Sequence, residues 1–292
     1  MAQTASTGSL ENAQRTIIAS VIYTQEHNAP AMNLIEKMTL QKGSSTVTVP
    51  KVGQMSISDL VDGQDIVDEE DIGMTTTSLT AAEVGAKVIL TDKLVRQSQA
   101  NIFQMIGRQL GEGMARKKDT DVHALYSGLN GGTVYGVANA VLSMQNVASG
   151  IAKAKGDKFG MDLYILHHPN AIYDLVNSAA VTPGTTYPIP SGFAADLLEK
   201  FWVGLRPING VSIFEDGNLA IDSDDDATGV IASKEALVVL ESVAQKTERQ
   251  RDASLRATEV VITADYGVFE LDDSRGAGWT ADASAPTTNR TS

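Results

Sequence analysis

Cysteine is absent from the 292 residues, which excludes disulfides, thiolate metal sites and cysteine nucleophiles. No apolar run approaches the ~18 residues that a membrane-spanning helix needs. The opening residues, MAQTASTGSLENAQ, lack the basic region and apolar run of a secretory signal. We therefore expect a protein without membrane contact that is made and kept in a cytoplasm.

The signatures of common enzymes are also missing. The sequence contains no GxSxG, no HExxH and no Gly-Lys-Ser/Thr phosphate loop. Gly111-Glu112-Gly113 is followed by Arg116 and lies in a predicted helix, so it is not a dinucleotide-binding fingerprint. We expect no catalytic residues, no cofactor and no enzymatic activity.

Two groups of residues invite a metal-site interpretation. His167 and His168 are adjacent and point to different sides of a strand or turn, which favours a structural role. The acidic group at 222–226 resembles the start of a calcium loop, but its sixth and twelfth positions are Ala227 and Ser233 instead of Gly and Glu. We predict a solvated turn there and no metal site, with a weak cation site as the alternative. That group consists of Asp222, Asp224, Asp225 and Asp226.

Positive charge is scarce. The chain has 23 Lys and Arg against 36 Asp and Glu, a net charge of −13, which excludes the basic face of a duplex-DNA binder. Such a charge favours solubility and repulsion between free copies. Self-assembly would therefore require local acidic patches to pair with local basic ones. Hydrophobic residues make up 42%, enough for the core of one large or two smaller domains.

Residues 91–128 predict a long amphipathic helix around which the chain is organised. Thr91 or Asp92 is a natural N-cap, and Gly128 a natural stop. If wholly helical, the stretch would be roughly 50 Å long at ~1.5 Å per residue. The alternative is two shorter helices with a break near residues 111–113. The apolar stripe consists of Val95, Ile102, Phe103, Ile106, Leu110 and Met114.

The segment before this helix predicts a two-stranded arm. Residues 46–50 (TVTVP) alternate with period two, and residues 86–90 (AKVIL) predict a second strand that could start as early as Thr75. We interpret residues 44–90 as a long hairpin with an acidic end; an ordinary solvated loop is the alternative. A hairpin is marginally stable alone, so a neighbouring chain is a good support for it. The acidic end contains Asp59, Asp62, Asp65, Asp68, Glu69, Glu70 and Asp71.

The remaining segments predict further elements. We expect a flexible tail at 1–9, an amphipathic helix at 10–25 and a short helix at 33–40. Beyond a glycine-rich crossing at 128–136, alternating strands and helices indicate an α/β layer. Helices are expected at 138–155, from Pro169 to 176 and at 194–202, with a loop at 181–192. Strands are expected at 162–166, 211–214, 229–232, 236–240, 260–263 and 267–271. A polar tail is expected from 280.

Three basic clusters stand out on this acidic chain. Each is either a solvated face or a receptor for the acidic arm of another copy. They are Arg116-Lys117-Lys118; Lys153, Lys155 and Lys158; and Lys246, Arg249, Arg251 and Arg256.

The order of these parts resembles the major capsid protein of tailed bacteriophages, with the Hong Kong 97 fold. The resemblance is carried by the hairpin TVTVPKVGQ…AKVILTD, the helix start TDKLVRQS, the segment LYILHHPNAIYDLV and the ending RQRDASLRATEVVITADYGVFELDD. It covers nearly the whole chain and rests on layout, not on a catalytic signature.

The resemblance implies an α+β fold of five parts. These are an N-terminal arm (1–43), an extended loop (44–90), a peripheral domain (91–135 plus 236–280), an axial domain (136–235) and a flexible tail (281–292). It also implies hexamers and pentamers that close an icosahedral head shell around double-stranded DNA, without sequence-specific contact. The protein would be assembled in the host cytoplasm and reside in the virion; scaffolding, portal and decoration proteins remain open as partners.

Two hypotheses and two rivals follow. The acidic end of the arm would dock on Arg116–Lys118 or on the 246–256 cluster of a neighbour. Some relatives cross-link through a lysine in the extended loop, but here the acidic end has none and Lys51 is near the base, so we expect a non-covalent shell.

Gly107, Gly111 and Gly113 are either close-packing residues or a soft point that lets the helix bend. The rivals are an encapsulin-like compartment and a soluble α/β enzyme or ligand-binding protein.

Overall fold

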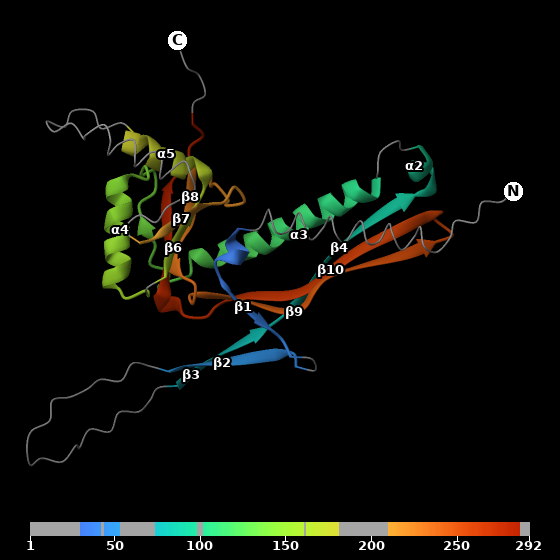
Figure 1. Cartoon of the computed structure of the whole chain (residues 1–292), viewed down its shortest axis with the longest axis horizontal. Helices are drawn as coiled ribbons and strands as arrows, with labels where there is room; N and C mark the ends of the chain where they lie inside the picture. The colour runs from blue at the N-terminus through green and yellow to red at the C-terminus, as the bar shows by residue number, and fades with distance from the viewer. Residues whose placement is uncertain are drawn as a thin grey trace, which may run out of the picture.

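A computed structural model describes residues 30–41, 44–52, 74–97, 102–160, 162–180 and 210–286. The described strands form a four-stranded sheet (β1-β9-β10-β4), a five-stranded sheet (β5-β11-β8-β6-β7) and a two-stranded ribbon (β2-β3). The five-stranded sheet lies at one end with α4 and α5, and the four-stranded sheet extends away from it beside α3 (Figure 1). The expected tail at 1–9, the helices at 10–25 and 194–202 and the loop at 181–192 lie outside the described residues.

The four-stranded sheet is built on a long antiparallel pair, β9 (Leu237–Asp252) and β10 (Ala257–Glu270). β4 (Ala82–Thr91) pairs antiparallel with β10, and β1 (Glu36–Thr39) pairs parallel with β9. The short helix expected at 33–40 is therefore wrong, because residues 36–39 form β1 shortly after the 3₁₀ turn η1 (Ala31–Asn33). An edge strand takes its conformation from the partner to which it hydrogen-bonds, which local propensity does not reveal.

The long helix is α3 (Ile102–Tyr126), about 37 Å at ~1.5 Å per residue. Ile106, Leu110 and Met114 are buried, and α3 packs on β10 and β4, so the predicted stripe is confirmed for these residues. The helix runs unbroken through residues 111–113, so the predicted alternative of a break there is wrong. A shorter helix, α2 (Asp92–Gln97), precedes it, and residues 98–101 between them lie outside the described part.

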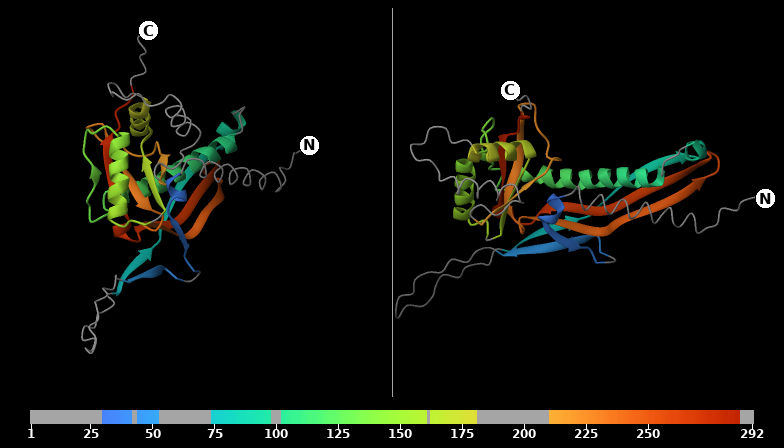
Figure 2. Two further views of the ribbon diagram at one scale, coloured as in Figure 1. Left: turned by 60° about the vertical axis from the view of Figure 1, so that its left-hand side comes forward. Right: turned by 45° about the horizontal axis from the view of Figure 1, so that its top comes forward.

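The arm begins as β2 (Thr46–Val52) paired antiparallel with β3 (Met74–Thr80). The ribbon projects away from both sheets in all views (Figures 1 and 2). The strands at 46–50 and from Thr75 are thus confirmed, but residues 86–90 belong to β4 and pair with β10 instead of extending the hairpin. The acidic residues 59–71 lie outside the described part.

The α/β layer is confirmed at the other end. The sheet contains β5 (Tyr135–Gly136), β6 (Leu163–His167), β7 (Ser212–Glu215), β8 (Asp226–Ser233) and β11 (Gly276–Asp282). Ile165 of β6 belongs to the core formed with α4 (Met144–Gly156) and α5 (Pro169–Ala180), whereas Tyr164 and Leu166 belong to the core formed with α3. The period-two alternation of one buried strand thus joins two helical layers.

Three boundaries differ from the sequence predictions. α4 starts at Met144 after the N-cap Ser143, not at 138, and the strands expected at 260–263 and 267–271 are one strand, β10. The chain expected to be a polar tail from 280 contains the end of β11, in which Ala281 is buried at 1% exposure. Earlier in β11, Gly278 is needed because a side chain there would come 2.7 Å from the carbonyl oxygen of Tyr126.

Candidate functional site

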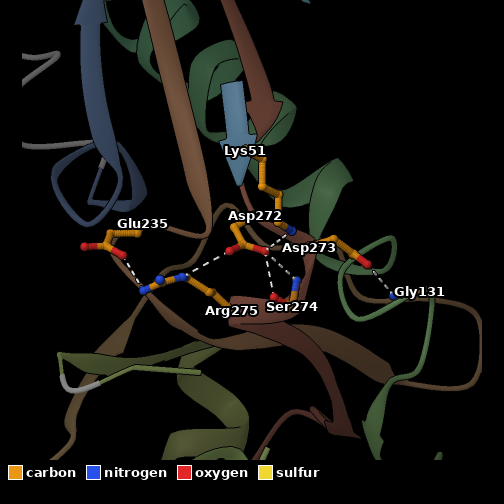
Figure 3. A network of polar contacts seen from close by, with 7 residues as sticks. All are labelled: Lys51, Gly131, Glu235, Asp272, Asp273, Ser274 and Arg275. Atoms are coloured by element: carbon orange, nitrogen blue, oxygen red, sulfur yellow. Dashed lines mark hydrogen bonds and ion pairs between the residues drawn. The ribbon is translucent and has the colours of Figure 1, made fainter. Parts of the chain in front are cut away.

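The base of the arm and the loop after α3 contact the link between β10 and β11, which joins the two sheets (Figure 3). In this link Asp272 caps the turn η2 (Asp273–Arg275), accepting from the Ser274 backbone at 3.1 Å. Lys51 of β2 donates to Asp272 at 2.5 Å, and Arg275 Nε donates to the same carboxylate at 3.1 Å. Asp273 accepts from the backbone of Gly131 at 2.9 Å. The network therefore ties the arm to the point where the chain passes from one sheet to the other.

The network contains two cations, Lys51 and Arg275, and three carboxylates, those of Asp272, Asp273 and Glu235. Burial raises the pKa of Asp272, but the hydrogen bonds from Lys51 and Ser274 outweigh it and hold the pKa below its ordinary value. Arg275 also pairs with Glu235. The Lys51 side chain is 44% exposed, so its pair with Asp272 is worth about 0–1 kcal/mol and mainly fixes direction.

An apolar cluster supports the same anchor. Leu79 of β3 packs with Val238 and Leu240 of β9, and all three are fully buried. Val47 and Val49 of β2 pack against this cluster from the ribbon. The described part of the arm is thus held by apolar burial, and the ion pair with Lys51 lies beside it.

The first basic cluster is not one patch. Lys118 is 3% exposed, donates to Glu241 at 3.0 Å and lies over the ring of Tyr266. Lys117 pairs with Asp121 at 2.5 Å on the same helix. Arg116 is exposed beside a polar cavity of about 320 Å³. Successive helical residues point in different directions, so Arg116 and Lys117 face solvent while Lys118 does not, and Lys117 is already paired with Asp121.

The basic residues of the cluster at 246–256 do not share one face, because successive residues of a strand point to opposite sides. Lys246 pairs with Glu248, and Arg251 makes two hydrogen bonds to Asp92, at 2.5 and 2.6 Å. Lys246 lies on one face of β9, and Arg249 and Arg251 on the other. Arg256 is exposed in the turn between β9 and β10.

The third cluster lies on and after α4. Lys153 lies over the ring of Tyr135 at 4.4 Å, and Lys155 is exposed in the same helix. Lys158 follows the helix with a positive φ of 61°. These lysines are thus placed on the outer helix of the five-stranded sheet, away from the arm.

The three glycines of α3 differ in their surroundings. Gly107 and Gly111 are buried, whereas Gly113 is exposed. A Cβ added at Gly113 would meet no atom within 4 Å among the described residues. Close packing therefore does not explain a glycine at 113.

The two groups considered as metal sites, at 167–168 and 222–226, form hydrogen bonds with the backbone instead. His167 is buried; its Nε2 donates to Trp279 O at 3.2 Å and its Nδ1 accepts from the His168 backbone at 2.9 Å. Burial lowers the pKa of His167 to about 4, so the ring is neutral. Asp222 accepts from the backbone of Asp224 and Asp226, each at 2.9 Å. Across the described ranges, no three histidine or acidic side chains are placed to hold a metal ion. In the same ranges, no helix is long and apolar enough to cross a membrane.

Sequence reasoning missed a buried polar cluster at the end of α3. Asp119 is 0% exposed and accepts from Asn218 Nδ2 at 2.9 Å; Asp216 is 3% exposed and accepts from His123 Nε2 at 3.0 Å. The sequence contains a signal for this cluster, because Asp119 and His123 fall at helical spacing beside Ala115 and Val122, which are buried.

Comparison with known proteins identifies the family. The model of the phage capsid protein family matches residues 74–279, from β3 to Trp279 of β11 and more than half the chain. The chain belongs to this family. As a phage capsid protein it is structural rather than enzymatic, associates with further copies of itself and has its place in the virion shell. A sequence comparison with curated proteins finds no match.

Solved structures establish the fold at low sequence identity. The capsid of the cyanophage P-SCSP1u is 15% identical with a TM-score of 0.62, covering 86% of this chain and 87% of that one. The Microbacterium phage Oxtober96 structure is 12% identical with a TM-score of 0.63, covering 87% and 91%. The SrpI encapsulin of Synechococcus elongatus is 12% identical with a TM-score of 0.61, covering 89% and 90%. Together with the family match, they confirm a major capsid protein with the predicted Hong Kong 97-like α+β fold.

Proposed function

We propose that this capsid protein builds the icosahedral head shell of a tailed phage around its double-stranded DNA genome. The observation that carries the proposal is the family match over residues 74–279, joined to a fold shared with phage capsids along most of the chain. Copies gather as hexamers and pentamers. The net charge of −13 suits a container that makes no sequence-specific contact with DNA, because small cations can neutralise the packaged DNA.

Each part of the chain has a role in this shell. The four-stranded sheet with α3 serves as the peripheral domain, and the five-stranded sheet with α4 and α5 serves as the axial domain at the centres of hexamers and pentamers. β11 belongs with the axial sheet through its pairing with β8, although the sequence alone assigned most of residues 276–282 to the peripheral domain. The β2–β3 ribbon is the base of the extended loop, which lies over an adjacent subunit.

The acidic end of that loop docks on basic residues of the adjacent subunit. Seven carboxylates in thirteen residues without a basic residue, 59–71, favour such a contact. Arg116 and Arg256 suit the receiving role best, since both are exposed and Lys118 and Arg251 already have partners within the chain. Because the acidic end has no lysine, the contact is non-covalent.

The glycines of α3 give the long helix a soft point. Each glycine inside a helix costs roughly 1 kcal/mol relative to alanine, and Gly113 has no packing reason in the described chain. Replacing Gly107, Gly111 and Gly113 with alanine should slow any expansion of a precursor shell, followed by time-resolved scattering. Expansion at the wild-type rate would make them packing or neutral positions.

Assembly takes place in the host cytoplasm, with scaffolding, portal and decoration proteins as candidate partners. The test of the proposal is the content of shells purified from the cells that naturally make them. Nuclease-protected double-stranded DNA is expected inside. The second candidate, an encapsulin-like compartment, is favoured by the likeness to the SrpI encapsulin, and it predicts a packaged protein and no protected genome.

A further inference from the structure

The buried acids at the end of α3 come from two separate elements. Asp119 lies on α3, and Asp216 follows β7 of the five-stranded sheet. Asn218 bridges them, since its side chain donates to Asp119 at 2.9 Å and its backbone donates to Asp216 at 2.8 Å. The pair therefore sits in the contact between the long helix and the axial sheet.

One oxygen of this pair lacks a donor. Asp119 Oδ1 is buried and has no hydrogen-bond partner in the described part of the chain. Asn218 hydrogen-bonds to both carboxyl groups, at 2.9 Å and 2.8 Å, so the two acids belong to one buried cluster. Two ionised carboxylates held near each other away from water repel each other strongly, so a proton on Asp119 removes the repulsion.

We propose that Asp119 carries a proton in the closed junction, that this proton locks α3 to the five-stranded sheet, and that its loss loosens the junction. Burial and the neighbouring Asp216 raise the pKa of Asp119 to about 7. The other ionisable groups facing the pair are His123 and Tyr126 of α3, Tyr164 of β6 and His168 after β6, with Glu112, Arg116 and Glu215 at the adjoining cavity.

The direction of the pH effect follows from the pKa of Asp119 in the open and in the closed junction. In an open junction Asp119 has its ordinary pKa of 3.8, whereas in the closed junction its pKa is about 7, so opening releases a proton between these values. Raising the pH therefore favours opening until about pH 7, above which the effect levels off. Between pH 6 and pH 8 the opening equilibrium should rise about tenfold. The neutral His167, whose pKa is about 4, acts in the opposite direction only below pH ~6.5, so its effect is limited to the lower end of this window.

The test is hydrogen exchange of the full chain in one assembly state at pH 6 and pH 8, corrected for the intrinsic pH dependence of exchange. Peptides from residues 112–126 and 211–219 should show about tenfold more opening at pH 8 in the wild type. Asp119→Asn should abolish the rise, because the amide does not ionise and keeps an acceptor for Asn218. The control Asp224→Asn, on an exposed turn, should keep the wild-type rise.

An equal rise in the wild type and Asp119→Asn, or no rise in the wild type, would overturn the proposal. If Asp119→Asn does not fold, a wild-type pH series decides the matter: a one-proton slope that levels near pH 7 supports the lock, and a flat profile below pH 7 contradicts it. Hydrogen exchange measures the opening of the junction inside each chain. The result therefore does not depend on whether the shell holds DNA or protein.

Discussion

Single residues set the fit between the five-stranded sheet and the helix α4. Gly150 of α4 lies against the indole of Trp279, and a Cβ at this position would collide with the ring. Trp279 is 3% exposed, so its ring has little room to move, and its backbone carbonyl accepts from the buried His167. These contacts join α4, β11 and β6.

Gly150→Ala should therefore destabilise the protein even though alanine favours helices. Overpacking costs about 1–3 kcal/mol, against at most about 1 kcal/mol gained in helix propensity. The matched control is Gly156→Ala in the same helix, where a Cβ would meet no atom within 4 Å and stability should be equal or higher. Thermal unfolding of the three proteins in the same assembly state measures the difference. Equal midpoints for the two variants would show that the Trp279 contact does not constrain α4.

At the scale of elements, the arm ribbon depends on a small anchor. Lys51 of β2 reaches Asp272 at the link between the sheets, while Leu79 of β3 is buried against β9. The apolar contact supplies most of the stability, because a half-exposed ion pair contributes little. The pair instead fixes where the ribbon leaves the body.

Lys51→Met should loosen the ribbon without unfolding the sheets. Hydrogen exchange of β2 and β3 should rise up to about fivefold, the equivalent of about 1 kcal/mol. Lys87→Met is the matched control, since Lys87 pairs with Glu259 at 2.7 Å and is 49% exposed, close to the 44% of Lys51. It should leave the exchange of the ribbon unchanged. The anchor is refuted if both variants raise ribbon exchange equally or neither raises it.

Elements with a strong internal period could be predicted, and those defined by their partners could not. The stripe of Ile106, Leu110 and Met114 is visible at helical spacing, and α3 follows it. β1 and β11 were missed because a short edge strand and a glycine-rich strand gain their conformation from β9 and β8. The pairing of β2 with β3, with β4 going to β10, is likewise a tertiary choice.

The candidate site shows the same division. The basic residues were found, but sequence could not tell that Lys118 is buried against Glu241 while Arg116 is exposed. The acid pair was missed because an aspartate in a helix is usually solvated, whereas here Asp119 is buried and hydrogen-bonded to Asn218, which follows β7 and is distant in sequence.

At the scale of the whole molecule, we propose that charge governs the contacts between copies. A chain with net charge −13 repels its copies, so contacts between subunits need local complementarity. The acidic end of the arm offers the strongest local charge in the sequence. Each exposed pair is worth about 0–1 kcal/mol, but a shell repeats it in every copy.

Removing three arm charges with Asp68→Asn, Glu69→Gln and Glu70→Gln should therefore raise the protein concentration needed for assembly and reduce its dependence on salt. The control removes three exposed charges outside the arm, with Asp162→Asn, Asp224→Asn and Asp225→Asn. It should leave assembly unchanged or favour it, because overall repulsion falls. Light scattering at low and high salt measures both. Identical behaviour of the two triple variants would rule out docking of the arm through charge.

The central claim is that this chain assembles with itself into a shell, and the most direct measurement is sedimentation velocity of the purified protein with electron microscopy of the fast fraction. The account predicts uniform closed shells or capsomer rings. A single species of one to four copies at every protein concentration, salt and level of crowding agent would contradict it.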